Sequence, residues 1–325
     1  MTESKETDAH VGTCALCDHQ DVVLKESHSI PKFVYQWVKN TSRTPYLRCS
    51  DNVNVREQDG PKEYLLCGDC EQHLSAMEAE LAEQLFKKIA NYRTQAQTIS
   101  ITESMRAGIL SIFWRTLLTS ANRSHDRTPE DQALVSEFLA SAKDQIKKVD
   151  VTTPIYIAPF HGEPPFFELP QQLTYLLDRM VGAQDIRFFD VPHRYFAVFK
   201  LPFMFFYIAS DGWSEQVDPN AEFVGTLTPA KIRSIPDFLR YYILHLVEQF
   251  KAADASMSQE SREQIGQDAS KCARTTGSDK STSRSRASKR NDARDHVSTA
   301  LRKLSENGQD LPQLHSSDCT PRANP

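Results

Sequence analysis

The sequence predicts an α+β fold in which helices come first, strands follow and a further helix closes the structured part. Three observations support this prediction. Apolar residues recur with helical spacing in the first half of the chain, aromatic and β-branched residues gather in short runs over 186–210, and residues 252–325 are nearly free of aromatics. Helices and strands therefore segregate along the chain instead of alternating as in a β-α-β repeat.

Composition limits the class of protein. The chain has 325 residues, of which 39% are hydrophobic and 25% charged, with a net charge of −5. No apolar run approaches the roughly 20 residues of a membrane helix, so no membrane partner is expected. Residues 1–13 have neither the basic nor the apolar segment of an export signal, and we expect them to be flexible. The 7 cysteines are odd in number and include two CxxC pairs, which predicts a reducing cytoplasm and a metal site.

The region 14–93 contains the predicted metal site. Cys14 and Cys17 form the first CxxC pair, and Cys67 and Cys70 form the second, where an apolar strand meets a helix. Four thiolates close the tetrahedral shell of Zn²⁺, so the ion would be structural. A knuckle, a hairpin and a helix carrying the second pair together predict a treble clef. The alternative is two reduced pairs in a core, or a redox CxxC motif.

The helix that follows Cys70 has a single apolar face. Apolar residues recur along it at helical intervals, with acidic and basic residues between them. We interpret this stripe as core packing: Leu74, Met77, Leu81, Leu85 and Ile89.

The region 94–251 is predicted to be an α+β domain. Residues 99–120 have the apolar content of a buried helix, and Thr128 followed by Pro129 and two acids begins another, which should end near Lys148. A strand is expected over 153–160 and a helix over 170–182. Strands follow over 186–210, broken at Pro192 and Pro202, and a last helix begins at Asp237.

The region 252–325 is predicted to be a disordered basic and polar tail. It contains too few apolar residues for burial to offset the loss of chain entropy. Its centre, SRSRASKRNDAR, is either a solvated segment or an electrostatic arm for nucleic acid or an acidic partner. A short helix is expected within it at 296–304.

The segments CALC, SHSIP and LLCGDCEQH resemble the HNH endonuclease family, over about residues 14–75. The resemblance implies that His28 is a general base, which activates water against a phosphodiester in DNA or RNA beside a catalytic Mg²⁺ or Mn²⁺. Ser27, Lys62 and Glu71 replace the Asp, Asn and His of the family pattern. Glu71 could hold the ion through oxygen, with Glu26 or Glu63 as a second carboxylate.

The whole chain also resembles a group of uncharacterised bacterial proteins. They share the SHxIPK module, a QDGxKExLLCxxCE segment, here 58–71, and a Ser-x-x-Trp-Arg helix, here 111–115. Arg115 in that helix is either an anion site or the partner of a buried carboxylate. His73 is interpreted as a surface or supporting group beside the metal site.

Two functional hypotheses remain open. In the first, His28 is the base of an HNH-like hydrolase of nucleic acid. In the second, the zinc module is an inactive scaffold, His28 is a packed residue or an accessory metal ligand, and the protein is a binding or regulatory component of a larger bacterial assembly.

Overall fold

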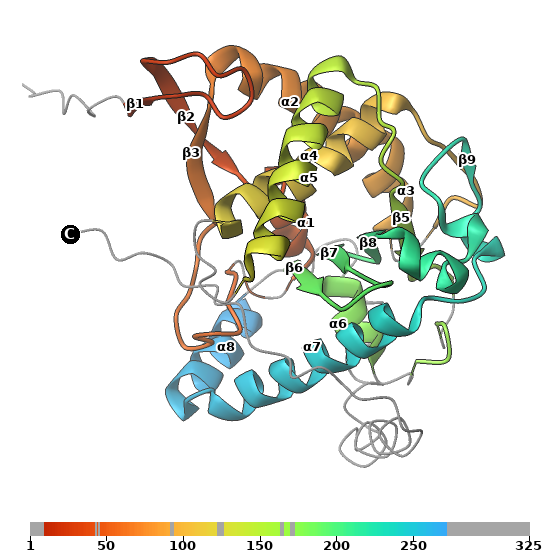
Figure 1. The fold of residues 1–325 in the computed structure, drawn as a ribbon. Helices are drawn as coiled ribbons and strands as arrows, with labels where there is room; N and C mark the ends of the chain where they lie inside the picture. Colours follow the sequence, from red (N-terminus) through yellow and green to blue (C-terminus); the bar gives the residue numbers. More distant parts are fainter. Residues whose placement is uncertain are drawn as a thin grey trace, which may run out of the picture.

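The computed structural model confirms a mixed helix and strand architecture (Figure 1). It describes residues 10–42, 44, 46–91, 94–121, 127–162, 166–169 and 173–271. Residues 1–9, the basic centre of the predicted tail and the helix expected at 296–304 lie outside this part of the chain.

The first sheet is three-stranded and antiparallel, in the order β1-β2-β3. Its strands are β1 (Val11–Gly12), β2 (Val22–His28) and β3 (Lys62–Cys67), and α1 (Lys32–Thr41) lies between β2 and β3 in the chain. The prediction that all of 1–13 is flexible was wrong for β1, because its residues pair with Val22 and Val23 of β2.

The helix after the second cysteine pair forms as predicted, as α2 (Gly68–Glu80), a π-helical segment (Leu81–Phe86) and α3 (Lys87–Ile89). The whole predicted stripe is buried. This face packs against the next helix at Gly108, where an added Cβ would lie 2.7 Å from Leu81 Cδ1. Glycine therefore allows close contact between the two helices.

That next helix, α4 (Glu103–Ala121), begins later than predicted. Ile99–Ser100 forms strand β4 instead and pairs with β9 (Thr226–Leu227), a partner more than 120 residues away. The following helix, α5 (Pro129–Lys148), has the predicted bounds. Thr128 accepts a hydrogen bond from the backbone of Asp131, and the Asp131 side chain caps Thr128 in return.

The larger sheet is antiparallel, in the order β5-β8-β7-β6. Its strands are β5 (Tyr156–Pro159), β6 (Gly182–Phe188), β7 (Tyr195–Leu201) and β8 (Met204–Ala209), so Pro192 and Pro202 fall between strands as predicted. The helix expected over 170–182 is shorter, α6 (Thr174–Arg179), because Gly182 already belongs to β6. Residues 170–172 lie outside the described part.

Short 3-10 helices follow at Asp211–Gln216, Pro219–Ala221 and Pro229–Lys231. The last predicted helix forms as α7 (Asp237–Ser256), and a further helix, α8 (Gln259–Lys271), comes after it. The prediction of disorder from 252 onward was therefore wrong for residues 252–256 and 259–271.

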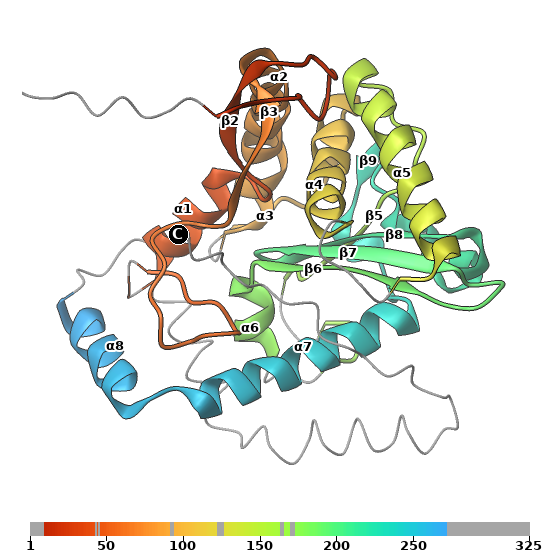
Figure 2. The ribbon, with the colours of Figure 1, turned by 60° about the vertical axis from the view of Figure 1, so that its left-hand side comes forward.

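Helices cover both faces of the larger sheet, with α4 and α5 on one side and α6 and α7 on the other (Figure 2). Alternate residues of β7 enter separate hydrophobic clusters: Ala197 and Phe199 pack with α4, and Phe196 and Val198 pack with α7. The cluster on the α4 side also contains Cys14 of the first region. The cysteine-bearing unit and the larger sheet therefore share one core.

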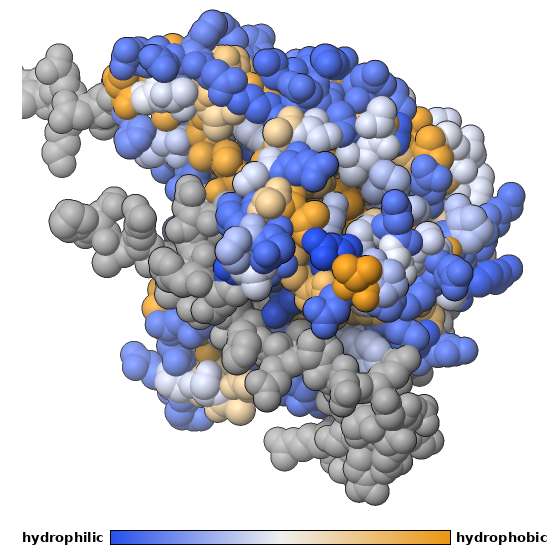
Figure 3. Space-filling model, viewed as in Figure 1, coloured by the Kyte–Doolittle hydropathy of each residue, from blue (hydrophilic) through white to orange (hydrophobic). Residues whose placement is uncertain are grey.

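The surface seen in Figure 3 is covered mainly by hydrophilic residues, with scattered hydrophobic ones. Within the described part of the chain, no helix combines the length and apolar character needed to cross a bilayer.

Candidate metal centre

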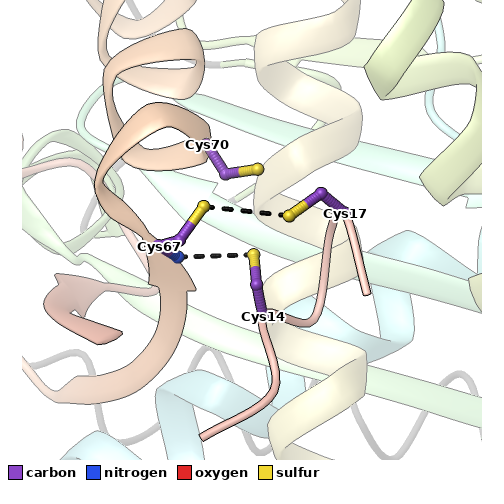
Figure 4. Close-up of side chains that lie close together, drawn as sticks. All are labelled: Cys14, Cys17, Cys67 and Cys70. Carbon is purple, nitrogen blue, oxygen red and sulfur yellow. Dashed lines mark hydrogen bonds between the residues drawn. The ribbon is translucent and has the colours of Figure 1, made fainter. Parts of the chain in front are cut away.

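Four cysteines from two distant segments meet at one end of the first sheet. Cys14 and Cys17 lie in the turn between β1 and β2, Cys67 ends β3, and Cys70 lies in the first turn of α2. Figure 4 shows the side chains converging, and their Sγ atoms all lie within 4.8 Å of one another. The structure thus brings the predicted zinc ligands together.

The spacing of the sulfur atoms suits a tetrahedral ion. Cys17 Sγ lies 3.8 Å from Cys67 Sγ. A Zn–S bond of about 2.3 Å in tetrahedral geometry places neighbouring sulfurs about 3.8 Å apart. Four sulfur ligands leave no open coordination position, so the cluster could hold an ion such as Zn²⁺ in a structural role.

The surroundings favour the thiolate form of Cys14 and oppose that of Cys70. Burial opposes ionisation of Cys14, but backbone hydrogen bonds from Cys17, Cys67 and Leu16 outweigh it and lower its pKa to about 7. Burial and the neighbouring cysteines raise the pKa of Cys70 far above its usual range. A dication bound among the sulfurs would favour the thiolate form of all four cysteines, because its positive charge stabilises each negative sulfur.

His28 ends β2 and pairs with a residue of the loop that leads into β3. Its Nε2 lies 3.0 Å from Asp59 Oδ2, and the two side chains are 12% and 26% exposed. Burial alone would raise the pKa of Asp59, but the Gly60 N–H, His28 and Lys62 outweigh it and lower that pKa. A Cβ at Gly60 would lie 2.0 Å from the Tyr35 ring, so glycine allows this loop to pack closely there.

Lys62 lies opposite His28 across the β2–β3 pair. Its Nζ is 3.1 Å from Glu26 Oε2 and 3.6 Å from Asp59 Oδ2. The hydrogen bond to Glu26 is the main cause that raises the pKa of Lys62. One ammonium group therefore pairs with both carboxylates.

The two predicted site residues on α2, Glu71 and His73, contact different parts of the structure. Glu71 accepts a hydrogen bond from the buried Ser27 hydroxyl, whereas His73 Nε2 lies 3.1 Å from the carbonyl oxygen of Ile146 in α5. Positions two apart on a helix do not share a face. Glu71 thus lies with the β2 strand that ends at His28, and His73 contributes to the contact between α2 and α5.

Arg115 links α4 to this region. The guanidinium donates to the carbonyl oxygen of His28 at 2.7 Å and to Glu78 Oε1 at 2.6 Å, and its side chain is only 2% exposed. Of the two roles considered for Arg115, the structure therefore supports pairing with a partly buried carboxylate.

Asp59 was not among the predicted site residues, although it lies in the Gln-Asp-Gly sequence at 58–60. The pairing joins residues 28 and 59 across a long connection, which no local periodicity indicates. The Asp-Gly sequence is typical of a turn, and it was the signal in the sequence that could have pointed to Asp59.

The carboxylates expected to bind a catalytic Mg²⁺ or Mn²⁺ do not form a ligand set. Glu26 pairs with Lys62, Glu71 accepts from Ser27, and Glu63 lies opposite Ser27 on β3. Among the described residues, only the four cysteines form a group of three or more potential ligands. We therefore assign no chemical step to such an ion.

Comparison with protein-family models, with curated proteins and with solved structures finds no match for this chain.

Proposed function

We propose that the protein is a zinc-stabilised hydrolase of phosphodiester bonds in nucleic acid, with His28 as the general base. The observation that carries the proposal is the pairing of His28 Nε2 with Asp59 Oδ2 at 3.0 Å. A carboxylate this close to one ring nitrogen favours the tautomer that carries its proton there, which leaves the other nitrogen free to act as a general base.

The local architecture supports an HNH-type treble clef around a structural Zn²⁺. A turn with the first cysteine pair, the antiparallel β2–β3 pair with α1 inserted between its strands, and a helix with the second pair follow one another along the chain. The strand pair places His28 at the end of β2 that is remote from the sulfur cluster, since Cys67 pairs with Leu24 near the other end. The metal would thus stabilise the strand pair without touching the substrate.

The proposed step uses residues of this chain alone. In the tautomer with its proton on Nε2, the nitrogen that lies beside Asp59, His28 carries its lone pair on Nδ1. Nδ1 takes a proton from water while the water oxygen bonds to phosphorus. The bond from phosphorus to the departing oxygen then breaks, and that oxygen takes a proton from solvent.

A nuclease assay tests the proposal. Full-length, zinc-loaded protein is incubated with labelled single-stranded DNA, duplex DNA or RNA, with and without added Mg²⁺ or Mn²⁺. Replacing His28 with alanine should slow cleavage by about 100-fold or more, since general-base catalysis contributes about 10² to 10⁴. Asp59→Asn should slow it without abolishing substrate binding, because orientation of the base is lost.

His19→Ala is the matched control, because His19 is an exposed histidine of the same unit. It should leave cleavage unchanged. Cleavage that survives His28→Ala, or no cleavage of any substrate by folded, zinc-loaded protein, would contradict the hydrolase.

A second candidate is an inactive scaffold within a larger assembly. It is favoured by the closed network around His28, in which Lys62 pairs with both Glu26 and Asp59 while Arg115 donates to the His28 carbonyl oxygen. This candidate predicts no cleavage by the wild type and a lower thermal midpoint for both His28→Ala and Asp59→Asn. The hydrolase instead predicts that activity falls while the midpoint changes little.

A further inference from the structure

Helix α8 is attached to the molecule by polar contacts. None of its residues is buried. Asn54 Oδ1 accepts from the Ser258 backbone N–H at 2.8 Å, and Asp268 Oδ2 lies 3.6 Å from Arg56 Nη1. The Arg56 and Asp268 side chains are 34% and 16% exposed, so this ion pair is partly accessible to solvent and weakens with salt. Because no residue of α8 is buried, the helix can leave the surface without exposing a core.

The surface under α8 contains two arginines from one loop. Burial, followed by repulsion from Arg56, lowers the pKa of Arg48, and Asp268 partly reverses this effect. Arg56 also lies over the Tyr46 ring, 5.0 Å from its centroid. Arg48 donates to the Val53 carbonyl oxygen within this loop, and Arg56 lies 3.6 Å from Asp268. The loop therefore presents two cations, one of which already pairs with a carboxylate, and is suited to bind an anion.

The same loop leads directly to the His28 region. Leu47 and Glu57 form an antiparallel bridge that ties the two sides of the loop together, and Asp59 follows two residues later. A strand of nucleic acid bound at the arginines would therefore be held by the loop that also holds the partner of His28.

We propose that Arg48 and Arg56 bind phosphates of a nucleic-acid backbone, and that α8 covers them, with Asp268 in place of a phosphate. The C-terminal helix then competes with nucleic acid and limits its access. This inference rests on the proposed function, because it takes the same class of substrate.

Binding to a fluorescein-labelled oligonucleotide, measured by anisotropy, tests the proposal. The full chain carries His28→Ala throughout, so that no cleavage disturbs the measurement. Asp268→Asn keeps the side-chain oxygen that accepts from Gln264 Nε2 but removes the charge. It should tighten binding about two- to fivefold at low salt, in line with the strength of one exposed ion pair. The slope of log K against log salt should steepen by about 0.7 to 0.9.

Two further variants make the measurement specific. Arg56→Gln should weaken binding, and in that background Asp268→Asn should have less than half its effect, because the competing pair is already broken. Glu260→Gln is the control: Glu260 lies on the same helix and, within the described part of the chain, forms no ion pair with either arginine.

Three results would overturn the proposal. They are equal affinity of Asp268→Asn and its parent, an equal gain from Glu260→Gln, and no binding by any variant at low salt. The hydrolase proposal fails if protein with intact His28 cleaves no substrate. The binding response is measured in the His28→Ala background, without cleavage, so the two failures can be told apart.

Discussion

Lys200 lies within β7 with its side chain fully buried. Its Nζ donates to the Leu201 carbonyl oxygen at 2.6 Å and lies 5.6 Å and 5.1 Å from the ring centroids of Phe160 and Phe205. Burial lowers the pKa of Lys200 to about 7, against the opposing attraction of Asp178. The folded protein therefore favours the neutral amine at a pH where the unfolded chain is still protonated.

This difference predicts a pH-dependent stability. Between about pH 7 and 10.4 the unfolded state binds one more proton than the folded state, so the free energy of unfolding rises with pH, by at most about 1.4 kcal/mol per unit. Lys200→Met removes this contribution. Urea denaturation at several pH values from 7 to 9 should show a smaller rise for the variant than for the wild type.

The exposed Lys87, paired with Glu83 on the helix surface, provides the control. Lys87→Met should keep the wild-type pH dependence. Parallel curves for Lys200→Met and wild type would show that Lys200 is protonated in the folded state throughout this range.

At the scale of elements, α5 shows how local chemistry specifies a helix. Thr128 and Asp131 cap each other's backbone N–H groups, and Pro129 occupies the first turn. Thr128→Ala should lower the free energy of unfolding by about 1 kcal/mol, because the Asp131 N–H in the first turn loses its acceptor. Thr128→Ser, which keeps the hydroxyl, should retain most of the stability. Equal losses in the two variants, measured by urea denaturation, would contradict the capping role.

Such local signals explain which elements could be predicted. The start of α5, the buried stripe of α2 and the strand breaks at Pro192 and Pro202 are encoded within a few neighbouring residues. The four ligands were found because CxxC spacing reflects metal geometry. Elements and pairs that depend on distant partners were missed, including β4, which pairs with β9, and Asp59, which pairs with His28.

Helix α8 was missed for a different reason. It has no buried residue, so it lacks the apolar periodicity that identifies a helix packed on a core. Its polar composition matches that of a disordered segment. Contacts to Asn54 and Arg56 hold the helix, and neither is visible in its own sequence.

At the scale of the whole molecule, the cysteine cluster belongs to the main core. Cys14, Leu16 and Cys67 lie in the same hydrophobic cluster as Trp114 of α4 and Phe199 of the larger sheet. If the cluster binds a metal, loss of that metal would leave four unbound cysteine side chains at the edge of this shared cluster. Metal binding and folding should therefore be coupled across both regions.

Cys67→Ser tests this coupling. The variant should bind no zinc, and its thermal midpoint should fall by about 10 °C or more, since metal binding contributes directly to folding free energy. Far-UV circular dichroism and tryptophan fluorescence should report the same lowered midpoint, because Trp114 and Trp213 lie in the two clusters on either side of the larger sheet. Cys49→Ser, outside the cluster, should keep one zinc ion per chain and the wild-type midpoint. Retained zinc and an unchanged midpoint in Cys67→Ser would contradict the metal centre, whereas two separate transitions would contradict the shared core.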